Sequence, residues 1–267
     1  MTLFTNDQTA IVTGGSQGLG LATAKEMISR GLGRIAIVGR NRKKGAAAAA
    51  ELGSLGAESL FIAADLSEPD APARVVAETE ERFGAIHALI NAASLTDRDT
   101  IWDSAPDFFD RIFATNVRAP LFLIQGVVRN MREHEVEGAI VNVGSIAGHG
   151  GPPFITSYCA SKGALMTLTR NLAGALAARR IRVNIVNPGW MDTPAEDEIQ
   201  RKYHGATDGW LEEAGAAQPF GRLIEPAEVA RTIAFYASPA SGLITGASID
   251  FDQHVVGAGP HTEHELA

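Results

Sequence analysis

The pattern of apolar and polar positions alternates between two kinds of segment along most of the chain. Short runs of β-branched and other apolar residues end in glycine, asparagine, aspartate or serine, which is typical of strands. Between them lie longer stretches with apolar residues at helical spacing, such as residues 19–31, which stop at Gly31. The strand pattern occurs in seven runs, at residues 9–14, 34–39, 59–65, 88–91, 138–145, 182–189 and 246–251.

The order of these segments predicts the fold class. Strands that alternate with helices are typical of repeated βαβ units with a parallel sheet, and wholly apolar strands indicate burial on both faces. We therefore expect a Rossmann-like, doubly wound α/β fold with a mostly parallel seven-stranded sheet and helices on both faces. Because no linker or composition break divides the chain, we expect one domain over residues 1–267. Residues 190–220 look like a polar insertion on the substrate side, and residues 257–267 like a loose tail.

Composition narrows the classes of function. The chain is 45% hydrophobic and 20% charged, as soluble globular proteins are, and contains no run of about 18 apolar residues. Its net charge of -8 argues against nucleic acid or an anionic membrane as the main partner. The single cysteine, Cys159, permits no intrachain disulfide, and the first residues lack the features of a signal peptide. We therefore expect a cytoplasmic protein.

A glycine-rich stretch joins the first expected strand to the first expected helix. Residues 12–20, VTGGSQGLG, place Gly14, Gly18 and Gly20 at this junction. Glycines let the backbone approach a phosphate closely, and the following helix N-terminus offers free N–H groups to it. The spacing is G-x-x-x-G-x-G rather than G-x-G-x-x-G, however, so this stretch alone fits a structural turn equally well.

Six stretches stand out along the chain: TGGSQGLG (13–20), AADL (63–66), ATNV (114–117), NVGS (142–145), YCASK (158–162) and NPGWMDT (187–193). In their order and spacing they resemble the short-chain dehydrogenase/reductase family over residues 8 to about 252. The resemblance implies an NAD(P)(H)-dependent oxidoreductase that interconverts a secondary alcohol and a ketone. The chain departs from the family pattern at Asn91-Ala92-Ala93-Ser94, where Asn-Asn-Ala-Gly is usual, and at Asp252-Gln253-His254, where Asp-Gly-Gly is common.

The same resemblance implies the residues of the site. The catalytic residues would be Asn116, Ser145, Tyr158 and Lys162. Lys162 would also bind the nicotinamide ribose, and Asn116 would hold a water that links Lys162 to solvent. The cofactor would contact Gly14, Ser16, Gln17, Gly18, Leu19, Gly20, Arg40, Asp65, Leu66, Asn91, Ala93, Tyr158, Lys162, Pro188, Gly189, Met191 and Thr193.

The chemistry of the Tyr158–Lys162 pair follows from residue type and spacing. Residues four apart share one helix face, and an ammonium group beside a phenol favours the phenolate. We therefore expect Lys162 to lower the pKa of Tyr158, so that the phenol can exchange a proton with an alcohol or carbonyl. Ser145 would hold the substrate oxygen. Taken alone, each residue also fits an ordinary structural role, namely a surface pair, a loop cap or a solvated helix position.

Other candidate groups are assigned no chemistry. Cys159 is interpreted as a small buried filler beside Tyr158. The seven histidines show no paired ligand spacing, so the sequence predicts no metal site.

The end of the second expected strand bears on cofactor choice. Residues 38–44, VGRNRKK, contain no acid, and Gly39 stands where NAD-binding folds place one. Arg40 follows, and its guanidinium suits a 2′-phosphate, although a solvated basic turn is the alternative. NADP(H) is therefore favoured, with NAD(H) possible.

Substrate contacts are expected from residues 94–100, 148–154 and 190–220. The last segment contains Trp190, Met191, Glu196, Asp197, Glu198, Tyr203, His204 and Trp210. This polar mixture favours a small polyol, sugar or hydroxy-ketone. A 3-oxoacyl thioester reductase is one alternative, which the negative net charge disfavours because its carrier protein is acidic. A non-catalytic dinucleotide-binding sensor or scaffold is another, which the retained Tyr158 and Lys162 disfavour. The resemblance also implies a homotetramer, or a homodimer, built through the helices around Asn116 and Tyr158 and through the last strand.

Overall fold

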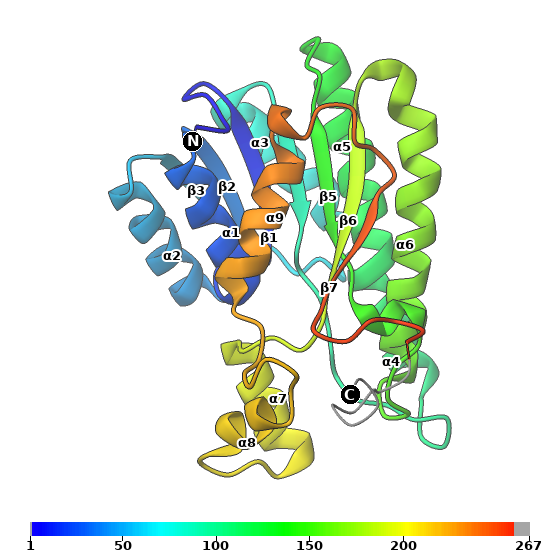
Figure 1. Cartoon of the computed structure of the whole chain (residues 1–267). Helices are drawn as coiled ribbons and strands as arrows, with labels where there is room; N and C mark the ends of the chain where they lie inside the picture. Colours follow the sequence, from blue (N-terminus) through cyan, green and yellow to red (C-terminus); the bar gives the residue numbers. More distant parts are fainter. Residues whose placement is uncertain (1, 259–267) are drawn as a thin grey trace, which may run out of the picture.

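A single seven-stranded sheet organises the chain (Figure 1). The structure, a computed structural model, describes residues 2–258. The strands are all parallel and lie in the order β3-β2-β1-β4-β5-β6-β7, which confirms the expected α/β fold. Their bounds are β1 (Thr9–Thr13), β2 (Arg34–Gly39), β3 (Glu58–Ala63), β4 (Ala88–Asn91), β5 (Ala139–Val143), β6 (Arg182–Pro188) and β7 (Ser248–Phe251).

Helices cover both faces of this sheet. The α-helices are α1 (Gly18–Ser29), α2 (Arg42–Ser54), α3 (Ala71–Phe83), α4 (Pro106–Phe113), α5 (Ala119–Glu133), α6 (Thr156–Leu176), α7 (Pro194–His204), α8 (Trp210–Ala216) and α9 (Pro226–Ala237). Shorter helical turns are η1 (Ala114–Arg118), η2 (Ile146–His149), η3 (Ala177–Arg179) and η4 (Pro239–Ser241). Helices α1, α2 and α9 pack on one face, whereas α3, α5 and α6 pack on the other.

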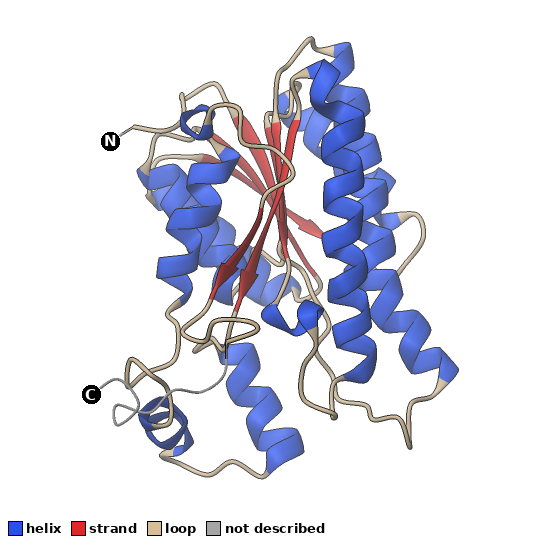
Figure 2. Cartoon of the chain, turned by 45° about the vertical axis from the view of Figure 1, so that its right-hand side comes forward, coloured by secondary structure: helices blue, strands red, loops and turns tan. Residues whose placement is uncertain are grey.

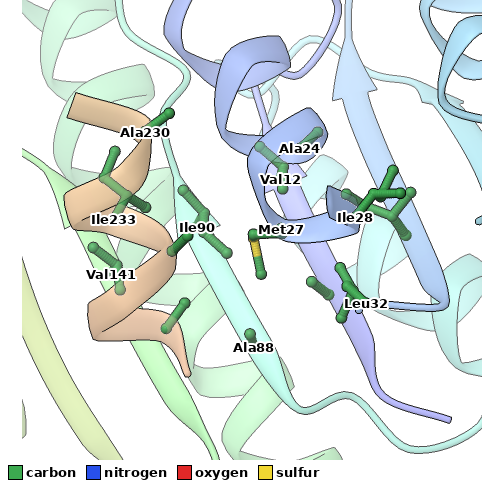
Figure 3. Close-up of a cluster of buried hydrophobic side chains, with 14 of the residues drawn as sticks. Val12, Ala24, Met27, Ile28, Leu32, Ala88, Ile90, Val141, Ala230 and Ile233 are labelled. Carbon is green, nitrogen blue, oxygen red and sulfur yellow. The ribbon is translucent and has the colours of Figure 1, made fainter. Parts of the chain in front are cut away.

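Alternation of side chains along the strands supplies two separate cores. In β1, Val12 joins the core beneath α1 and α9, while the neighbouring Ile11 joins the core beneath α3 and α5. Figure 3 shows the first core, where Met27 of α1 and Ile233 of α9 meet Ile90 of β4. All five residues of β1 and of β5 are buried, which explains why apolar residues dominate both strands.

The strand order places a crevice at the carboxyl end of β1. Strand β1 pairs with β2 on one side and with β4 on the other, so the chain direction of the crossovers reverses there. In doubly wound sheets, ligands bind outside the carboxyl ends of the strands at this reversal. The loops after β1 and β4 therefore line the expected binding crevice.

Residues 190–220 form two helices beyond the carboxyl ends of the strands (Figure 2). Thr193 and Pro194 explain the start of α7, because the Thr193 hydroxyl accepts a hydrogen bond from the Glu196 N–H and proline suits the first helical turn. The segment contains no strand, as expected, and only an isolated bridge pairs Met191 with Ile224.

The chain after β7 returns to this helical segment. The Gln253 amide accepts a hydrogen bond from the Phe220 N–H at 2.8 Å and donates one to the Arg222 carbonyl at 2.7 Å. Asp252 lies directly against Gly189, where a Cβ atom would clash with its carboxyl group. The Asp252-Gln253-His254 departure therefore fastens the turn at 218–222. The expected loose tail falls mainly on residues 259–267, which lie outside the described residues.

Residues 2–258 contain no helix that is both long and apolar enough to span a membrane.

Candidate active site

The glycine-rich stretch forms a tight loop at the carboxyl end of β1. Gly14 and Gly18 adopt φ values of 67° and 55°, which strain any residue with a Cβ atom. A Cβ on Gly20 would lie 2.4 Å from the Gly14 carbonyl oxygen, so α1 can approach the loop only because this position is glycine. The N-terminus of α1 thus faces the crevice, as a dinucleotide phosphate site requires.

A cavity of about 270 Å³ lies along this loop and crosses the carboxyl ends of β2, β3 and β4. Most of the predicted cofactor residues line it: Gly14, Ser16, Gln17, Gly18, Leu19, Gly20, Arg40, Asp65, Leu66, Ala93, Met191 and Thr193. The remaining predicted residues, Asn91, Tyr158, Lys162, Pro188 and Gly189, lie outside its walls. The structure adds Val38, Gly39, Ala64, Ala92, Ser94, Leu95, Thr96, Thr115 and Ala195 to the lining.

The turn after β4, where the sequence reads Asn91-Ala92-Ala93-Ser94, is held by hydrogen bonds to β1. The Thr13 hydroxyl accepts hydrogen bonds from the N–H groups of Ala92 and Ala93, both at 3.0 Å. A Cβ on Gly14 would lie 3.0 Å from the backbone of Ala93, so the two loops touch. Thr13, which the sequence analysis did not single out, therefore ties the β1 and β4 ends together.

The end of β2 presents a basic side chain to the same cavity. Arg40 is exposed at the cavity wall, and Gly39 packs so closely that a Cβ there would lie 2.9 Å from the Ser16 hydroxyl. Lys44, from the same basic stretch, donates a 2.7 Å hydrogen bond to Gln17. A second cation thus stands at the edge of the loop.

Asp65 faces Arg40 from the end of β3. Burial raises the pKa of the Asp65 carboxyl, but hydrogen bonds from Ser67 and the charges of Arg40 and Arg111 outweigh it, so the pKa is lowered overall. The Ser67 hydroxyl donates to Asp65 at 2.8 Å. The carboxylate therefore stays ionised and fixed at the cavity wall.

Tyr158 and Lys162 occupy one face of α6 beneath the crevice. Lys162 is 2% exposed, and its Nζ donates a 2.8 Å hydrogen bond to the Val143 carbonyl at the end of β5. The same Nζ lies 5.5 Å from the Tyr158 ring centroid. Ser145 lies two residues beyond β5, and its side chain acts to lower the pKa of the half-buried Tyr158 phenol. The two α6 residues are therefore not a surface pair.

The pKa of Tyr158 moves in the opposite direction to the expectation. Burial raises it to about 12, with the hydrogen bond from Ser145 working the other way. Burial also lowers the pKa of Lys162 to about 7, so near neutral pH a large fraction of this lysine carries no charge. The expectation rested on attraction between the two groups, whereas burial is the largest cause of the pKa shift of each.

Asn116 lies in the π-helical turn η1 and is 1% exposed. Its side-chain oxygen accepts hydrogen bonds from the Leu95 N–H and the Ser94 hydroxyl. Its amide nitrogen donates to the Leu95 carbonyl and to the Ser161 hydroxyl, both at 3.0 Å. The side chain therefore joins the β4 loop to α6, and both its oxygen and its nitrogen already make hydrogen bonds. The water-holding role stays a prediction, for the backbone of this residue.

A second cavity, of about 590 Å³, opens beside Tyr158 and Ser145. Its walls come from all three segments expected to contact the substrate: Thr96, Arg98, Ser145, Ile146, Ala147, Pro152, Phe154, Ile155, Tyr158, Gly189, Trp190, Met191, Thr193, Ala195, Glu196, Gln200 and His204. Asp197, Glu198, Tyr203 and Trp210 do not line it. Asp197 instead bonds Arg201 and Trp210, and Tyr203 bonds Asp97.

Cys159 is half-buried and packs against Gly151. Burial raises the pKa of its thiol, which keeps it protonated and supports the interpretation as a filler. Within residues 2–258, no three or more histidine, cysteine or acidic side chains gather as metal ligands would.

Comparison with known proteins adds to this geometry. The profile of a family described as short chain dehydrogenase matches residues 8–204. Sorbitol dehydrogenase of Cereibacter sphaeroides is 33% identical over 92% of this chain and 96% of its own length. The 3-oxoacyl-[acyl-carrier-protein] reductase FabG of Chlamydia pneumoniae is 31% identical over 91% and 94%. L-sorbose reductase of Gluconobacter frateurii, solved with NADPH and L-sorbose, superimposes with a TM-score of 0.88 at 28% identity, covering 97% of this chain and 100% of that one.

Proposed function

The chain belongs to the short-chain dehydrogenase/reductase family, and from this premise we propose that it uses NADP(H) to interconvert a secondary alcohol and a ketone on a small polyol or sugar. That it is an oxidoreductase acting on CH–OH groups with a nicotinamide dinucleotide follows from the family. The preference for NADP(H), the substrate class and the roles of individual residues are the proposal.

The crevice fits a dinucleotide. Its floor is the Gly14–Gly20 loop, where backbone replaces side chains, and the N-terminus of α1 points into it. Arg40, with the Ser16 hydroxyl beside Gly39, supports 2′-phosphate binding, since a guanidinium matches a phosphate and no carboxylate stands at the end of β2. The bound dinucleotide supplies or accepts the hydride.

Tyr158 would move the proton at the substrate oxygen. Its raised pKa keeps the phenol protonated at neutral pH, which suits donation to a carbonyl oxygen during reduction. Ser145 would hold the same oxygen, because its side chain lines the same cavity as the Tyr158 phenol. Lys162, buried below Tyr158, would orient the ribose and, in its protonated form, compensate the charge on the phenol when the proton leaves.

The observation that carries the substrate proposal is the second cavity. It places Tyr158 and Ser145 in one cavity with the polar side chains of Arg98, Glu196 and Gln200, which stand among largely apolar walls. Such polar groups would be left unpaired by a purely apolar substrate, at a cost of about 1–3 kcal/mol each. Two of the compared proteins are named for sorbitol and L-sorbose, which agrees with a polyhydroxylated substrate.

A substrate panel followed by NADPH absorbance tests the proposal. Neutral ketoses such as L-sorbose, the matching polyols in the reverse direction, and an acetoacetyl thioester would be compared with NADPH and NADH. Turnover of a ketose or polyol with NADP(H) supports the proposal. Preferential reduction of the thioester would replace it with the 3-oxoacyl reductase alternative, which the similarity to FabG keeps open.

Tyr158→Phe tests the proton-transfer role in the same assay. Removal of the phenol oxygen should lower kcat by roughly 10²–10⁴-fold while leaving dinucleotide affinity unchanged, because the ring still fills its place. Tyr236→Phe, on the half-buried face of α9 and outside both cavities, is the matched control and should keep wild-type activity. A Tyr158→Phe variant with more than a tenth of wild-type activity would exclude Tyr158 as the acid or base.

A homo-oligomer, tetramer or dimer, remains part of the proposal. Phe122 on α5 and Leu243 after η4 are exposed apolar side chains that association would bury. Sedimentation velocity on the full chain measures the assembly directly, and a monomer at micromolar concentration would contradict it.

A further inference from the structure

Two opposite charges stand together on the wall of the substrate cavity that contains Tyr158. Arg98 comes from the loop after β4, and Glu196 comes from the first turn of α7. Their side chains are only 14% and 18% exposed, so both charges are largely withdrawn from water. Groups held in this way at a cavity wall are costly unless they have a partner.

Neighbouring groups fix the position of the Arg98 guanidinium. Its Nε donates to His204 Nε2 at 3.2 Å, and its Nη1 donates to the Thr96 carbonyl at 2.9 Å. The Phe154 ring lies beneath it, with 5.5 Å between the ring centroid and Cζ. Among the described residues, Nη2 makes no hydrogen bond, and its one charged neighbour is Glu196.

Glu196 is fixed through a single oxygen. Its Oε1 accepts hydrogen bonds from Trp190 Nε1 at 2.9 Å and from Gln200 Nε2 at 2.7 Å. Within residues 2–258, no hydrogen-bond donor reaches Oε2. Arg98 Nη2 lies 3.7 Å from Glu196 Oε1, which is beyond hydrogen-bonding distance. A free donor and a free acceptor therefore lie side by side, each on a side chain that other contacts hold still.

We propose that Arg98 and Glu196 form a clamp that binds a hydroxyl group of a neutral, polyhydroxylated substrate. This inference rests on the proposed function and names the residues that select its substrate. A hydroxyl is at once a donor and an acceptor, so one group, or two vicinal ones, can satisfy Glu196 Oε2 and Arg98 Nη2 together.

The pair disfavours other substrate classes for stated reasons. A carboxylate would gain from Arg98 but would face Glu196, and an ammonium group would meet the reverse problem. An alkyl chain would leave the donor and the acceptor unpaired in a site shielded from water. The clamp therefore favours hydroxyl groups in two ways: it bonds them, and it leaves charges repelled or unpaired when other substrates bind.

The same charges also act on Tyr158, which shapes the experiment. Glu196 raises the pKa of Tyr158 and Arg98 lowers it, so removing either charge changes proton transfer for every substrate. The informative quantity is thus a ratio of kcat/KM values for two substrates, in which a common effect on Tyr158 cancels.

The test compares reduction of L-sorbose, 2-hexanone and 2-ketogluconate by NADPH. Wild type, Glu196→Gln and Arg98→Met would be assayed on all three. The matched control is Glu213→Gln, which makes the same chemical change on exposed α8, outside the cavity. For both cavity variants, kcat/KM for L-sorbose relative to 2-hexanone should fall roughly ten- to hundredfold, because a hydrogen bond to a charged group is lost. Glu196→Gln should also raise the ratio for 2-ketogluconate over L-sorbose.

The outcomes separate the two proposals. Selective loss of L-sorbose turnover, with the control unchanged, supports the clamp. Reduction of L-sorbose by wild type with equal losses on L-sorbose and 2-hexanone in the variants overturns the clamp and leaves the proposed function standing. A wild type that reduces no ketose and oxidises no polyol overturns both.

Discussion

Lys162 places an ionisable group where the fold tolerates its neutral form better than its charged form. The side chain is buried against β5, and burial lowers the pKa of Lys162 to about 7. Burying an amine so that it loses its proton costs folding free energy. Residues of catalytic sites often carry such a cost. The proposed role in proton transfer accounts for a lysine at a position where an apolar side chain would pack more favourably.

Lys162→Met should therefore stabilise the chain while removing its activity. Between about pH 7 and 10.5, the unfolded chain holds a proton on this lysine that the folded chain lacks, so wild-type stability rises with pH in that window. The variant lacks this rise. Its advantage, largest near pH 7, should shrink by on the order of 1 kcal/mol per pH unit.

Urea unfolding at pH 7, 8 and 9 without added dinucleotide measures this difference. Lys25→Met, an exchange of an exposed lysine paired with Glu51, is the control and should show no such pH dependence. A constant difference between Lys162→Met and wild type over the three pH values would show that the folded lysine stays charged.

Arg40 gives the second prediction at this scale. If it binds the 2′-phosphate, Arg40→Ala should weaken NADP(H) binding roughly ten- to hundredfold and scarcely affect NAD(H), since a hydrogen bond to a charged group is lost. Lys43→Ala, an exposed neighbour outside the cavity, is the control. Fluorescence titration of both cofactors at one salt concentration measures the effect. Equal wild-type affinity for NAD(H) and NADP(H) would return Arg40 to the role of a solvated turn residue.

Single residues were predictable where a motif fixes both identity and place, and less so where burial decides. Most of the predicted cofactor residues line the first cavity, because the loop glycines and the strand ends set their positions. The pKa direction of Tyr158 was wrong, since spacing reveals a neighbouring lysine but not the loss of water around both groups. The bonding of Asn116 by the β4 loop depends on a contact between segments far apart in sequence.

At the scale of elements, the start of α6 depends on a carboxylate from another segment. Asp99 is 4% exposed and accepts hydrogen bonds from the Ser157 N–H at 3.0 Å and from the Ser157 hydroxyl. Ser104 donates to the same carboxylate at 2.7 Å. Asp99 therefore takes the place of an N-cap residue, because Ile155 at that position has no side chain that could accept a bond.

Asp99→Ala should lower the free energy of unfolding by about 2–3 kcal/mol, because Ser157 donors at the start of α6 lose a charged acceptor. Tyr158, one residue further along, should lose its fixed position, so kcat should fall more than KM changes. Asp110→Ala, on the exposed face of α4, should alter neither quantity. Unchanged stability of Asp99→Ala would mean that water caps the helix equally well.

Elements followed the apolar pattern closely wherever a strand or helix packs on the sheet. All seven expected strands occur, although β5 ends at Val143 rather than at residue 145. The helices of residues 190–220 were not specified, since their residues face cavities and solvent rather than a core with one period. The π-helical turn at Ala114–Arg118 likewise has no sequence period of its own.

At the scale of the molecule, the segment after β7 holds the helical segment that supplies one wall of the substrate cavity. Gln253 bonds the turn at 218–222, which follows α7 and α8. Gln253→Ala removes both hydrogen bonds to the 218–222 turn, so the α7–α8 segment should open more often. Limited proteolysis should cut residues 205–222 several-fold faster, and KM should rise more than kcat falls. Gln125→Ala, at an exposed position of α5, is the control. Equal cleavage rates for Gln253→Ala and wild type would show that the segment is held by its own helices.

The strand order also has a consequence for how the chain is made. Strands β1, β2 and β3 can pair as soon as residue 63 has left the ribosome, but the second edge of β1 must wait for β4. At ~5–20 residues per second, the roughly 25 residues between β3 and β4 take about one to five seconds to synthesise. During that interval a strand that is fully buried in the finished fold presents unpaired N–H and C=O groups to the cell. Nascent chains halted between residues 63 and 88 should therefore be the most prone to aggregate, and those in which β4 has emerged should be protected.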